Sequence, residues 1–212
     1  MSVQAKLCGL TSAAAVEASV KAGSAYAGFV FFDKSPRNVT PVQAAKLAAD
    51  IPQEIQTVAV LVNPQDEVLD MLLQTFRPAF LQLHGDESPE RVNTIRKQTG
   101  AKIIKALKVH AADDVARAGA YSAVADMLLF DAKAPEAALP GGNGLAFDWA
   151  LLRHREFALP WFLSGGLHAG NVAEAVQKTG AVRVDVSSGI ESGPGIKEPR
   201  LIREFMEVVN GL

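Results

Sequence analysis

The sequence predicts an α/β protein that folds as a single (β/α)8 barrel, and three observations lead to this fold class. Eight short runs rich in Val, Ile, Leu and Phe are typical of strands buried in a parallel sheet. Longer Ala-rich, charged segments with helical spacing alternate with these runs, which indicates repeated βα units. The chain has 212 residues, close to the short end of the range for such barrels. Eight βα units in so short a chain favour closure into one barrel over residues 1–212.

The expected strands are apolar runs, most of which end beside a glycine or a polar residue. They are Val3–Leu7, Tyr26–Phe32, Thr57–Val62, Phe80–His84, Lys102–Leu107, Asp126–Asp131, Trp161–Ser164 and Val182–Val186.

Caps and glycines mark the ends of the helices between these strands. Thr40-Pro41-Val42-Gln43 has the form of a capping box with proline at the first helical position. A cap residue also precedes a proline at Asn63-Pro64 and at Ser88-Pro89. Helices are expected to stop at three glycines, Gly23, Gly100 and Gly180. The remaining expectations are a short fifth helix, a long loop after strand six and a final helix, at Ala112–Ala118, Ala134–Gly144 and Pro199–Val209.

Composition narrows the classes of partner and location. The formal net charge is −2 and no long run of Lys or Arg occurs, so nucleic acid and membrane are not expected partners. The one cysteine, Cys8, rules out an intrachain disulfide and a Cys-rich metal site. No signal-like apolar run opens the chain, and no apolar stretch reaches the roughly 18 residues typical of a membrane span. We therefore expect a cytoplasmic protein.

Polar side chains collect where the expected strands run into helices, which is the functional end of such barrels. Because strand side chains alternate in direction, Lys6 and Cys8 share one face, and so do Gln82 and His84. By the same rule, an inward-facing Asp131 leaves Leu128 and Phe130 packed on helices, and Arg183 shares a face with Asp185. Burying polar groups costs free energy unless they are paired or hydrated. A polar barrel mouth that holds a ligand accounts for the pattern; a network of core ion pairs is the alternative.

Cys8 and Asp131 are the candidate base and acid of that mouth. Only a small part of a free thiol is thiolate at neutral pH, and Lys6 on the same face is expected to lower the pKa of Cys8. Asp131 follows four apolar residues, a setting that raises a carboxyl pKa and suits a general acid. The alternatives are a cysteine that serves only as a small buried apolar residue and an aspartate paired with Lys133.

Two glycine loops follow strands seven and eight, where barrels commonly bind phosphate through backbone N–H groups. Their candidate residues are Gly165, Gly166, Ser188 and Gly189. Two further candidates are ambiguous. Arg37 suits a bidentate contact with a carboxylate, although a loop arginine is often only solvated. His84 is a candidate acid, base or hydrogen-bond donor, or a structural histidine, and no second histidine stands at metal-ligand spacing from it.

Taken together, the motifs resemble the phosphoribosylanthranilate isomerase family from one end of the chain to the other. The residues that carry the resemblance are Lys6–Thr11, Gly28–Phe32, Lys34–Val39, Leu81–Glu87, Leu129–Asp131, Gly141–Gly144, Phe147–Trp149, Ser164–Leu167, Val184–Glu191 and Pro194–Lys197. Each motif is weak alone, but their joint occurrence in this order is specific.

The resemblance implies a TIM-barrel enzyme of tryptophan biosynthesis that performs an Amadori rearrangement. The substrate would be N-(5-phosphoribosyl)anthranilate and the product 1-(2-carboxyphenylamino)-1-deoxyribulose 5-phosphate. By match to the family, Asp131 would be the general acid and Cys8 the general base, and Arg37 would hold the anthranilate carboxylate. The glycine loops would bind phosphate and Asp185 would help to position the site. The resemblance implies neither a cofactor nor a metal.

The chain departs from the family pattern at three positions, Ser164, Asn143 and Leu145. The departures affect the detail of the glycine loop after strand six and its closure over substrate, not the reaction. Three rival functions remain open. One is an aldolase that uses Lys105, Lys108 or Lys133 as a Schiff-base lysine. The second is a barrel that binds a sugar phosphate without catalysis. The third is an isomerase that also accepts the analogous histidine-pathway intermediate, which Cys8 disfavours because that reaction usually uses two aspartates. Oligomeric state is not readable from the sequence.

Overall fold

A computed structural model describes residues 2–132 and 147–212, and its centre is a closed barrel of eight strands. Every neighbouring pair is parallel and the strands follow one another round the barrel in chain order, with β1 closing against β8. The (β/α)8 prediction is confirmed. The strands are β1 (Gln4–Cys8), β2 (Tyr26–Phe31), β3 (Gln56–Leu61), β4 (Phe80–Leu83), β5 (Lys102–Val109), β6 (Met127–Ala132), β7 (Trp161–Leu163) and β8 (Arg183–Val186).

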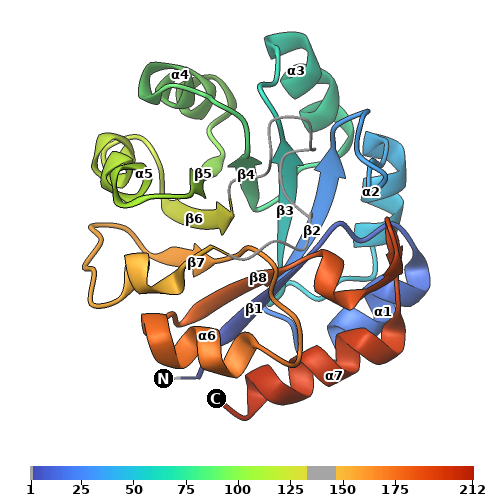
Figure 1. The fold of residues 1–212 in the computed structure, drawn as a ribbon. Coiled ribbons are helices and arrows are strands. Elements are labelled where there is room, and N and C mark those ends of the chain that lie inside the picture. Colours follow the sequence, from blue (N-terminus) through green and yellow to red (C-terminus); the bar gives the residue numbers. More distant parts are fainter. Residues whose placement is uncertain (1, 133–146) are drawn as a thin grey trace.

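Helices surround the barrel, and the chain ends lie on the same side of the molecule (Figure 1). The α-helices are α1 (Ala13–Lys21), α2 (Pro41–Ala48), α3 (Asp66–Thr75), α4 (Pro89–Thr99), α5 (Ala112–Ala116), α6 (Val172–Thr179) and α7 (Pro199–Asn210). Three short 3-10 helices are η1 (Arg117–Tyr121), η2 (Trp149–Leu152) and η3 (Ser188–Ile190). After η3, a small hairpin of β9 (Glu191–Gly193) and β10 (Ile196–Lys197) precedes α7. The expected loop at Ala134–Gly144 lies outside the described residues.

Most of the expected helix boundaries are confirmed. Thr40 and Gln43 form the capping box of α2, and Ser88 caps α4 through the Arg91 amide. The cap expected at Asn63 is wrong, because α3 begins at Asp66 and has no side-chain cap. Asn63 instead adopts a left-handed conformation (φ 45°), and its Oδ1 accepts a hydrogen bond of 2.9 Å from the Asp86 amide. An asparagine tolerates this conformation better than most residues, and here its side chain joins two loops.

The core has two layers divided by the barrel wall. Inside the barrel, one cluster joins Cys8 to apolar side chains from β2 to β7, which are Tyr26, Val58, Val60, Phe80, Ile104, Ala106, Met127, Leu129 and Phe162. Between barrel and helices, a larger cluster contains Leu128 and Phe130. The alternation expected for strand six is therefore confirmed, and β6 aims Asp131 toward the barrel axis. Among residues 2–132 and 147–212, no helix has both the length and the apolar character needed to cross a membrane.

Phe162 supports the floor of the barrel mouth, and its removal tests this packing. It is fully buried, and its ring meets Tyr26 edge to face at 5.0 Å. We expect Phe162→Ala to lower the free energy of unfolding by about 3–5 kcal/mol, because the barrel interior cannot collapse around the cavity. Denaturant unfolding measures this loss. Val42→Ala, at a position that is 68% exposed, should change it by less than about 0.5 kcal/mol; equal effects would contradict the two-layer packing.

Candidate functional site

A buried ion pair lies directly behind the Cys8 thiol at the end of β1. Lys6 Nζ donates to Asp185 Oδ1 at 2.8 Å, and neither side chain is more than 5% exposed. Ser164 Oγ donates to the other carboxylate oxygen at 3.1 Å. Lys6 also acts on Cys8, because its positive charge lowers the pKa of that thiol. The end of β7, the end of β8 and β1 thus converge on one thiol, as the alternation of Lys6 with Cys8 predicts.

Burial and charge act in opposite directions on this thiol. Burial raises the pKa of Cys8, and the nearby Asp185 carboxylate adds to the effect, whereas Lys6 and Lys197 lower it; burial wins. The expectation that Lys6 lowers the pKa of Cys8 therefore has the correct sign for that one contact, but the net shift is upward. Burial also works against the charge of Lys6, yet Asp185 and Cys8 together outweigh it and raise the pKa of Lys6 above its ordinary value.

The space next to the thiol is kept open by a glycine. A Cβ atom on Gly28 would lie 3.1 Å from Cys8 Sγ and 3.2 Å from Lys6 Nζ, which is tighter than ordinary van der Waals contact. Gly28 and Cys8 are neighbours in the β1–β2 register. A side chain here would press on both the thiol and its cation.

On β4 and β6, three polar side chains form a second chain of hydrogen bonds inside the barrel. Gln82 Nε2 lies 2.8 Å from His84 Nδ1, and His84 Nε2 lies 3.1 Å from Asp131 Oδ2. Asp131 Oδ1 accepts the Ala132 amide at 2.9 Å. All three side chains are buried. His84 and Asp131, which are 47 residues apart in sequence, are therefore direct partners.

The hydrogen bonds that join Gln82, His84 and Asp131 allow two arrangements of their protons. When the Gln82 amide donates to Nδ1, Nε2 keeps the ring proton and donates to an ionised Asp131. The Gln82 Oε1 atom is buried and has no partner among the described residues. If the amide turns, Oε1 accepts a hydrogen bond from Nδ1–H, and Nε2 can then accept a hydrogen bond from the protonated carboxyl group of Asp131. The same three residues therefore fit Asp131 with and without its proton.

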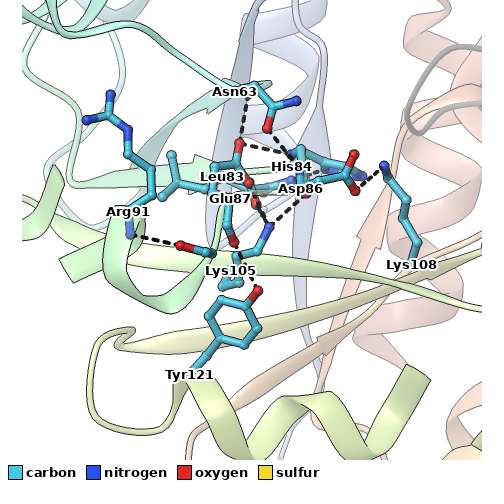
Figure 2. Close-up of polar contacts among 12 residues, drawn as sticks. Asn63, Leu83, His84, Asp86, Glu87, Arg91, Lys105, Lys108 and Tyr121 are labelled. Atoms are coloured by element: carbon cyan, nitrogen blue, oxygen red, sulfur yellow. Dashed lines mark hydrogen bonds and ion pairs between the residues drawn. The ribbon is translucent and has the colours of Figure 1, made fainter. Parts of the chain in front are cut away.

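A compact network outside the barrel wall holds the turn that carries His84 (Figure 2). Lys105 Nζ donates to Glu87 Oε2 at 2.7 Å and to the carbonyl oxygens of Leu83 and Gly85. Glu87 Oε1 accepts the amides of Asn63 and Gly85 at 2.8 and 3.1 Å. Lys105 is thus wholly engaged on the helix-facing side of β5, between Ile103 and Leu107 of the outer core.

Further contacts tie the same turn to its neighbours. Tyr121 donates its hydroxyl to the Glu87 carbonyl at 2.9 Å, and Lys108 pairs with Asp86 at 3.0 Å (Figure 2). The first contact is buried, whereas Asp86 is 76% exposed. The β4–α4 turn is consequently fixed from β3, β5 and η1 at once.

The glycine loops after β7 and β8 lie against each other. Gly165 and Gly166 have φ of 90° and 64°, values that favour glycine. A Cβ on Gly165 would lie 2.8 Å from the Ala132 amide nitrogen, and one on Gly189 would collide with the Leu167 carbonyl. Within the described part of the chain, the Gly165 and Gly166 amides donate no hydrogen bond. Backbone N–H groups without side-chain cover suit an anion.

Arg37 lies over the end of β1 and is held by a carboxylate from the β9–β10 hairpin. Its Nε and Nη2 donate to Glu191 Oε1 and Oε2 at 2.8 and 2.7 Å. Its Cδ would be 2.7 Å from a Cβ on Gly9, so the stem covers that glycine. Glu191 also accepts from Lys197 Nζ at 2.7 Å. Arg37 is buried, contrary to a solvated loop arginine.

The structure thus gathers Cys8, Asp185, His84, Asp131, Arg37 and the two glycine loops at one end of the barrel. Sequence reasoning did not identify Glu87, Glu191 and Lys197 as members of charged networks. Their sole signal was a charged residue inside an otherwise apolar or glycine-rich motif. Across the described residues, His, Cys, Asp and Glu nowhere gather in a group of three or more that could hold a metal ion.

In the Glu87–Lys105 pair, each buried charge is expected to stabilise the protein mainly by neutralising the other. Glu87→Gln leaves a buried ammonium without its carboxylate, so the free energy of unfolding should fall by about 3–5 kcal/mol. Adding Lys105→Met should recover part of that loss. The exposed pair of Glu17 with Lys21 is the control, and Glu17→Gln should cost less than about 1 kcal/mol. Equal losses for Glu87→Gln and Glu17→Gln in denaturant unfolding would show that the buried pair plays no such part.

Comparison with known proteins gives matches over nearly the whole chain. The sequence model of a family described as N-(5'phosphoribosyl)anthranilate (PRA) isomerase matches residues 5–208. A protein from Caulobacter sp. (strain K31) named N-(5'-phosphoribosyl)anthranilate isomerase is 51% identical over 209 residues, covering 98% of both chains. A protein of the same name from Paracoccus denitrificans is 52% identical over 207 residues, covering 97% of this chain and 96% of the relative.

Solved structures agree with the fold and with these relatives. The phosphoribosyl anthranilate isomerase from Thermotoga maritima superposes with a TM-score of 0.88 at 33% identity, covering 99% of this chain and 100% of that one. A phosphoribosyl anthranilate isomerase in complex with reduced 1-(o-carboxyphenylamino)-1-deoxyribulose 5-phosphate has a TM-score of 0.84 at 31% identity, with the same coverage. On this evidence, the chain belongs to the N-(5'-phosphoribosyl)anthranilate isomerase family.

Proposed function

We propose that this chain isomerises N-(5'-phosphoribosyl)anthranilate to 1-(2-carboxyphenylamino)-1-deoxyribulose 5-phosphate, a step of tryptophan biosynthesis. The observation that carries the mechanism is the placement of Cys8 on β1 and Asp131 on β6. Both face the barrel interior, and their strands are three places apart round the closed barrel. A substrate in the mouth therefore lies between a candidate base and a candidate acid. The reduced product analogue bound by a related isomerase supports a phosphorylated small molecule as substrate.

In the proposed reaction, Asp131 acts as the general acid. It gives its proton to the ribose ring oxygen while the C1–O bond breaks and the nitrogen lone pair forms a C1=N double bond. His84 supports this role because its Nε2 contacts Asp131 Oδ2 and accepts a hydrogen bond from the protonated carboxyl group in one of the two arrangements described above.

Cys8 then acts as the general base. Its thiolate removes the proton from C2, and the C–H electrons flow toward the iminium nitrogen to give an enolamine. The enolamine takes a proton at C1 and loses the proton of its C2 hydroxyl group, which gives the ketone. Lys6, held by Asp185, supplies the neighbouring positive charge that a buried thiolate needs.

Two anion sites would hold the two ends of the substrate. We assign the anthranilate carboxylate to Arg37 and the phosphate to Gly165, Gly166, Ser188 and Gly189. Arg37 stands beside the end of β1, where the aromatic end would lie next to Cys8. Its two bonds to Glu191 fix the guanidinium plane, so the incoming carboxylate meets an arginine of fixed orientation. Asp185 holds Lys6, and Ser164 holds Asp185, so we assign both residues to positioning the site.

The rival functions receive less support. Lys105 faces the helices and is bound to Glu87, so it is not a Schiff-base lysine of the mouth. Lys108 is paired with Asp86 at 3.0 Å, which favours its ammonium form over the free amine that a Schiff base needs, and Lys133 lies outside the described residues. Borohydride with a sugar phosphate should therefore trap no adduct. We retain as proposals one catalytic domain over residues 1–212, a cytoplasmic location, and no nucleic-acid or membrane partner.

A fluorescence assay tests the acid and the base directly. Phosphoribosylanthranilate, made in place from anthranilate and phosphoribosyl pyrophosphate, should lose its fluorescence when the protein is added. Asp131→Asn and Cys8→Ala should each cut turnover by about 10²–10⁴-fold, the usual contribution of general acid–base catalysis. Denaturant unfolding of each variant should show a cooperative transition, which establishes that the variant is folded. Normal turnover in Cys8→Ala would end the base assignment, and no turnover in the folded parent protein would end the proposed function.

Arg37 is expected to act chiefly in binding. Arg37→Ala should raise KM by about 10–100-fold, because a charged hydrogen-bonding contact is worth about 1.5–3 kcal/mol, with a smaller fall in kcat. Arg37→Lys keeps the charge but loses the bidentate geometry, so its KM should lie between those of the parent and of Arg37→Ala. Steady-state kinetics over a range of substrate concentrations separates KM from kcat; an unchanged KM in Arg37→Ala would move the carboxylate site elsewhere.

A further inference from the structure

Lys197 is a buried cation that the proposed reaction does not use. It belongs to β10 of the small hairpin after η3, and its side chain has no exposed surface. Its ammonium group meets three acceptors, the Ser187 carbonyl at 2.8 Å, Ser187 Oγ at 3.2 Å and Glu191 Oε1 at 2.7 Å. Three N–H donors with three acceptors describe a fully bonded ammonium ion. A buried charge of this kind is costly, so its position calls for a reason.

A short hydrogen-bonded path leads from Lys197 to Cys8. Ser187, which accepts from Lys197, donates its own hydroxyl to the Cys8 carbonyl at 3.1 Å. The ammonium group is therefore tied to the residue that bears the thiol through one intervening side chain. Cys8 and Lys197 also lie close enough for each to favour the charged form of the other.

The negative partner of Lys197 is shared with another cation. Glu191 Oε1 accepts from Lys197 at 2.7 Å and from Arg37 Nε at 2.8 Å, and Oε2 accepts from Arg37 as well. One carboxylate thus serves two cations. The other buried Lys–Glu pair differs, since Glu87 Oε2 serves Lys105 and Oε1 serves backbone amides (Figure 2). Because the Glu191 carboxylate is shared between Lys197 and Arg37, it compensates the charge of Lys197 only in part. A second negative charge close to Lys197, such as a thiolate, would complete that compensation.

We propose that Lys197 is a positioning residue for Cys8 whose buried charge, held by Glu191 and Ser187, favours the thiolate form of Cys8. The catalytic consequence rests on the proposed base role of Cys8, whereas the effect on the thiol itself does not. Lys6 and Lys197 then flank the thiol as two cations from different elements. Asp185, the facing anion, is bound to Lys6.

The direction of the effect follows from the charges that face Cys8, which are Lys6 on β1, Asp185 on β8 and Lys197 on β10. Removing the positive charge at residue 197 leaves burial and Asp185 opposed by Lys6 alone. The pKa of Cys8 must then rise further. In the parent protein, burial lowers the pKa of Lys197 to about 8, so its charge and its help to the thiolate fade as the pH passes that value.

The test is a thiolate titration, and the sequence makes it unambiguous. Cys8 is the one cysteine of the chain, so the ultraviolet absorbance of thiolate reports on it alone once the Cys8→Ala signal is subtracted. In Lys197→Met, the thiolate fraction at a given pH below about 8, where Lys197 is charged in the parent, should fall by about tenfold or more, the weight of a close opposite charge. Lys197→Arg, which keeps the charge, should titrate close to the parent. Lys197→Gln, which keeps an N–H donor, replaces Lys197→Met if that variant does not fold.

Lys105→Met is the matched control, because it also removes a buried, Glu-paired ammonium group but on the β5 side of the molecule. It should destabilise the fold and leave the Cys8 titration in place; the double change with Glu87→Gln serves if the single variant does not fold. A Cys8 titration that moves equally in both variants would show a general loss of structure and would overturn the proposal. So would one that moves in neither.

Kinetics gives a second, independent readout. In Lys197→Met, kcat should fall most below neutral pH and recover as the pH rises, since the rising limb of the profile follows the thiolate, and KM should stay near the parent value. A raised KM with an unmoved limb would assign Lys197 to substrate binding instead. Failure of the proposed function itself is distinguishable, because the folded parent protein would then show no turnover while the titration result still stands. Normal turnover in Cys8→Ala would end only the base role of Cys8.

Discussion

The requirement that charge buried in the barrel be compensated governs the arrangement of the whole site. Lys6, at the centre of the barrel, has no exposed surface, and an uncompensated ammonium group there would cost several kcal/mol. Asp185 removes that cost, and Ser164 completes the hydrogen bonding of Asp185. These bonds fix the ends of β1, β7 and β8 relative to one another. The position of the Cys8 thiol therefore depends on the ion pair between Lys6 and Asp185.

Acid and base have different electrostatic surroundings, as their proposed tasks demand. A base must reach its charged form, so Cys8 is flanked by cations that oppose the effect of burial. An acid must be able to hold its proton, and the partner of Asp131 is an imidazole that can be neutral. Two cations of β5 lie near that half, and each has a carboxylate partner. Lys105, outside the barrel wall, is matched by Glu87, and Lys108, the partner of Asp131 in the β5–β6 register, is matched by Asp86.

The parts of the structure that local chemistry determines were predictable from the sequence. Apolar runs locate all eight strands, and the period of a strand predicts that Lys6 shares a face with Cys8, and Asp131 with Leu129. The partner of each charge was not predictable, because pairs such as Arg37 with Glu191 join residues 154 positions apart. The Asn63 error has the same origin: a residue typical of a helix cap was recruited by a neighbouring loop.

The hairpin of β9 and β10 shows why such long-range contacts matter for chemistry. It adds no strand to the barrel, yet it supplies Glu191, the carboxylate at the centre of a charged cluster, and Lys197, one of the two cations bound to that carboxylate. Through Glu191 it orients the arginine proposed to receive the substrate carboxylate, and through Ser187 it reaches the backbone of Cys8. A shift of the hairpin must therefore move binding and base together. Because both effects pass through one carboxylate, the arginine cannot change its hold on Glu191 without altering the charge balance around the thiol.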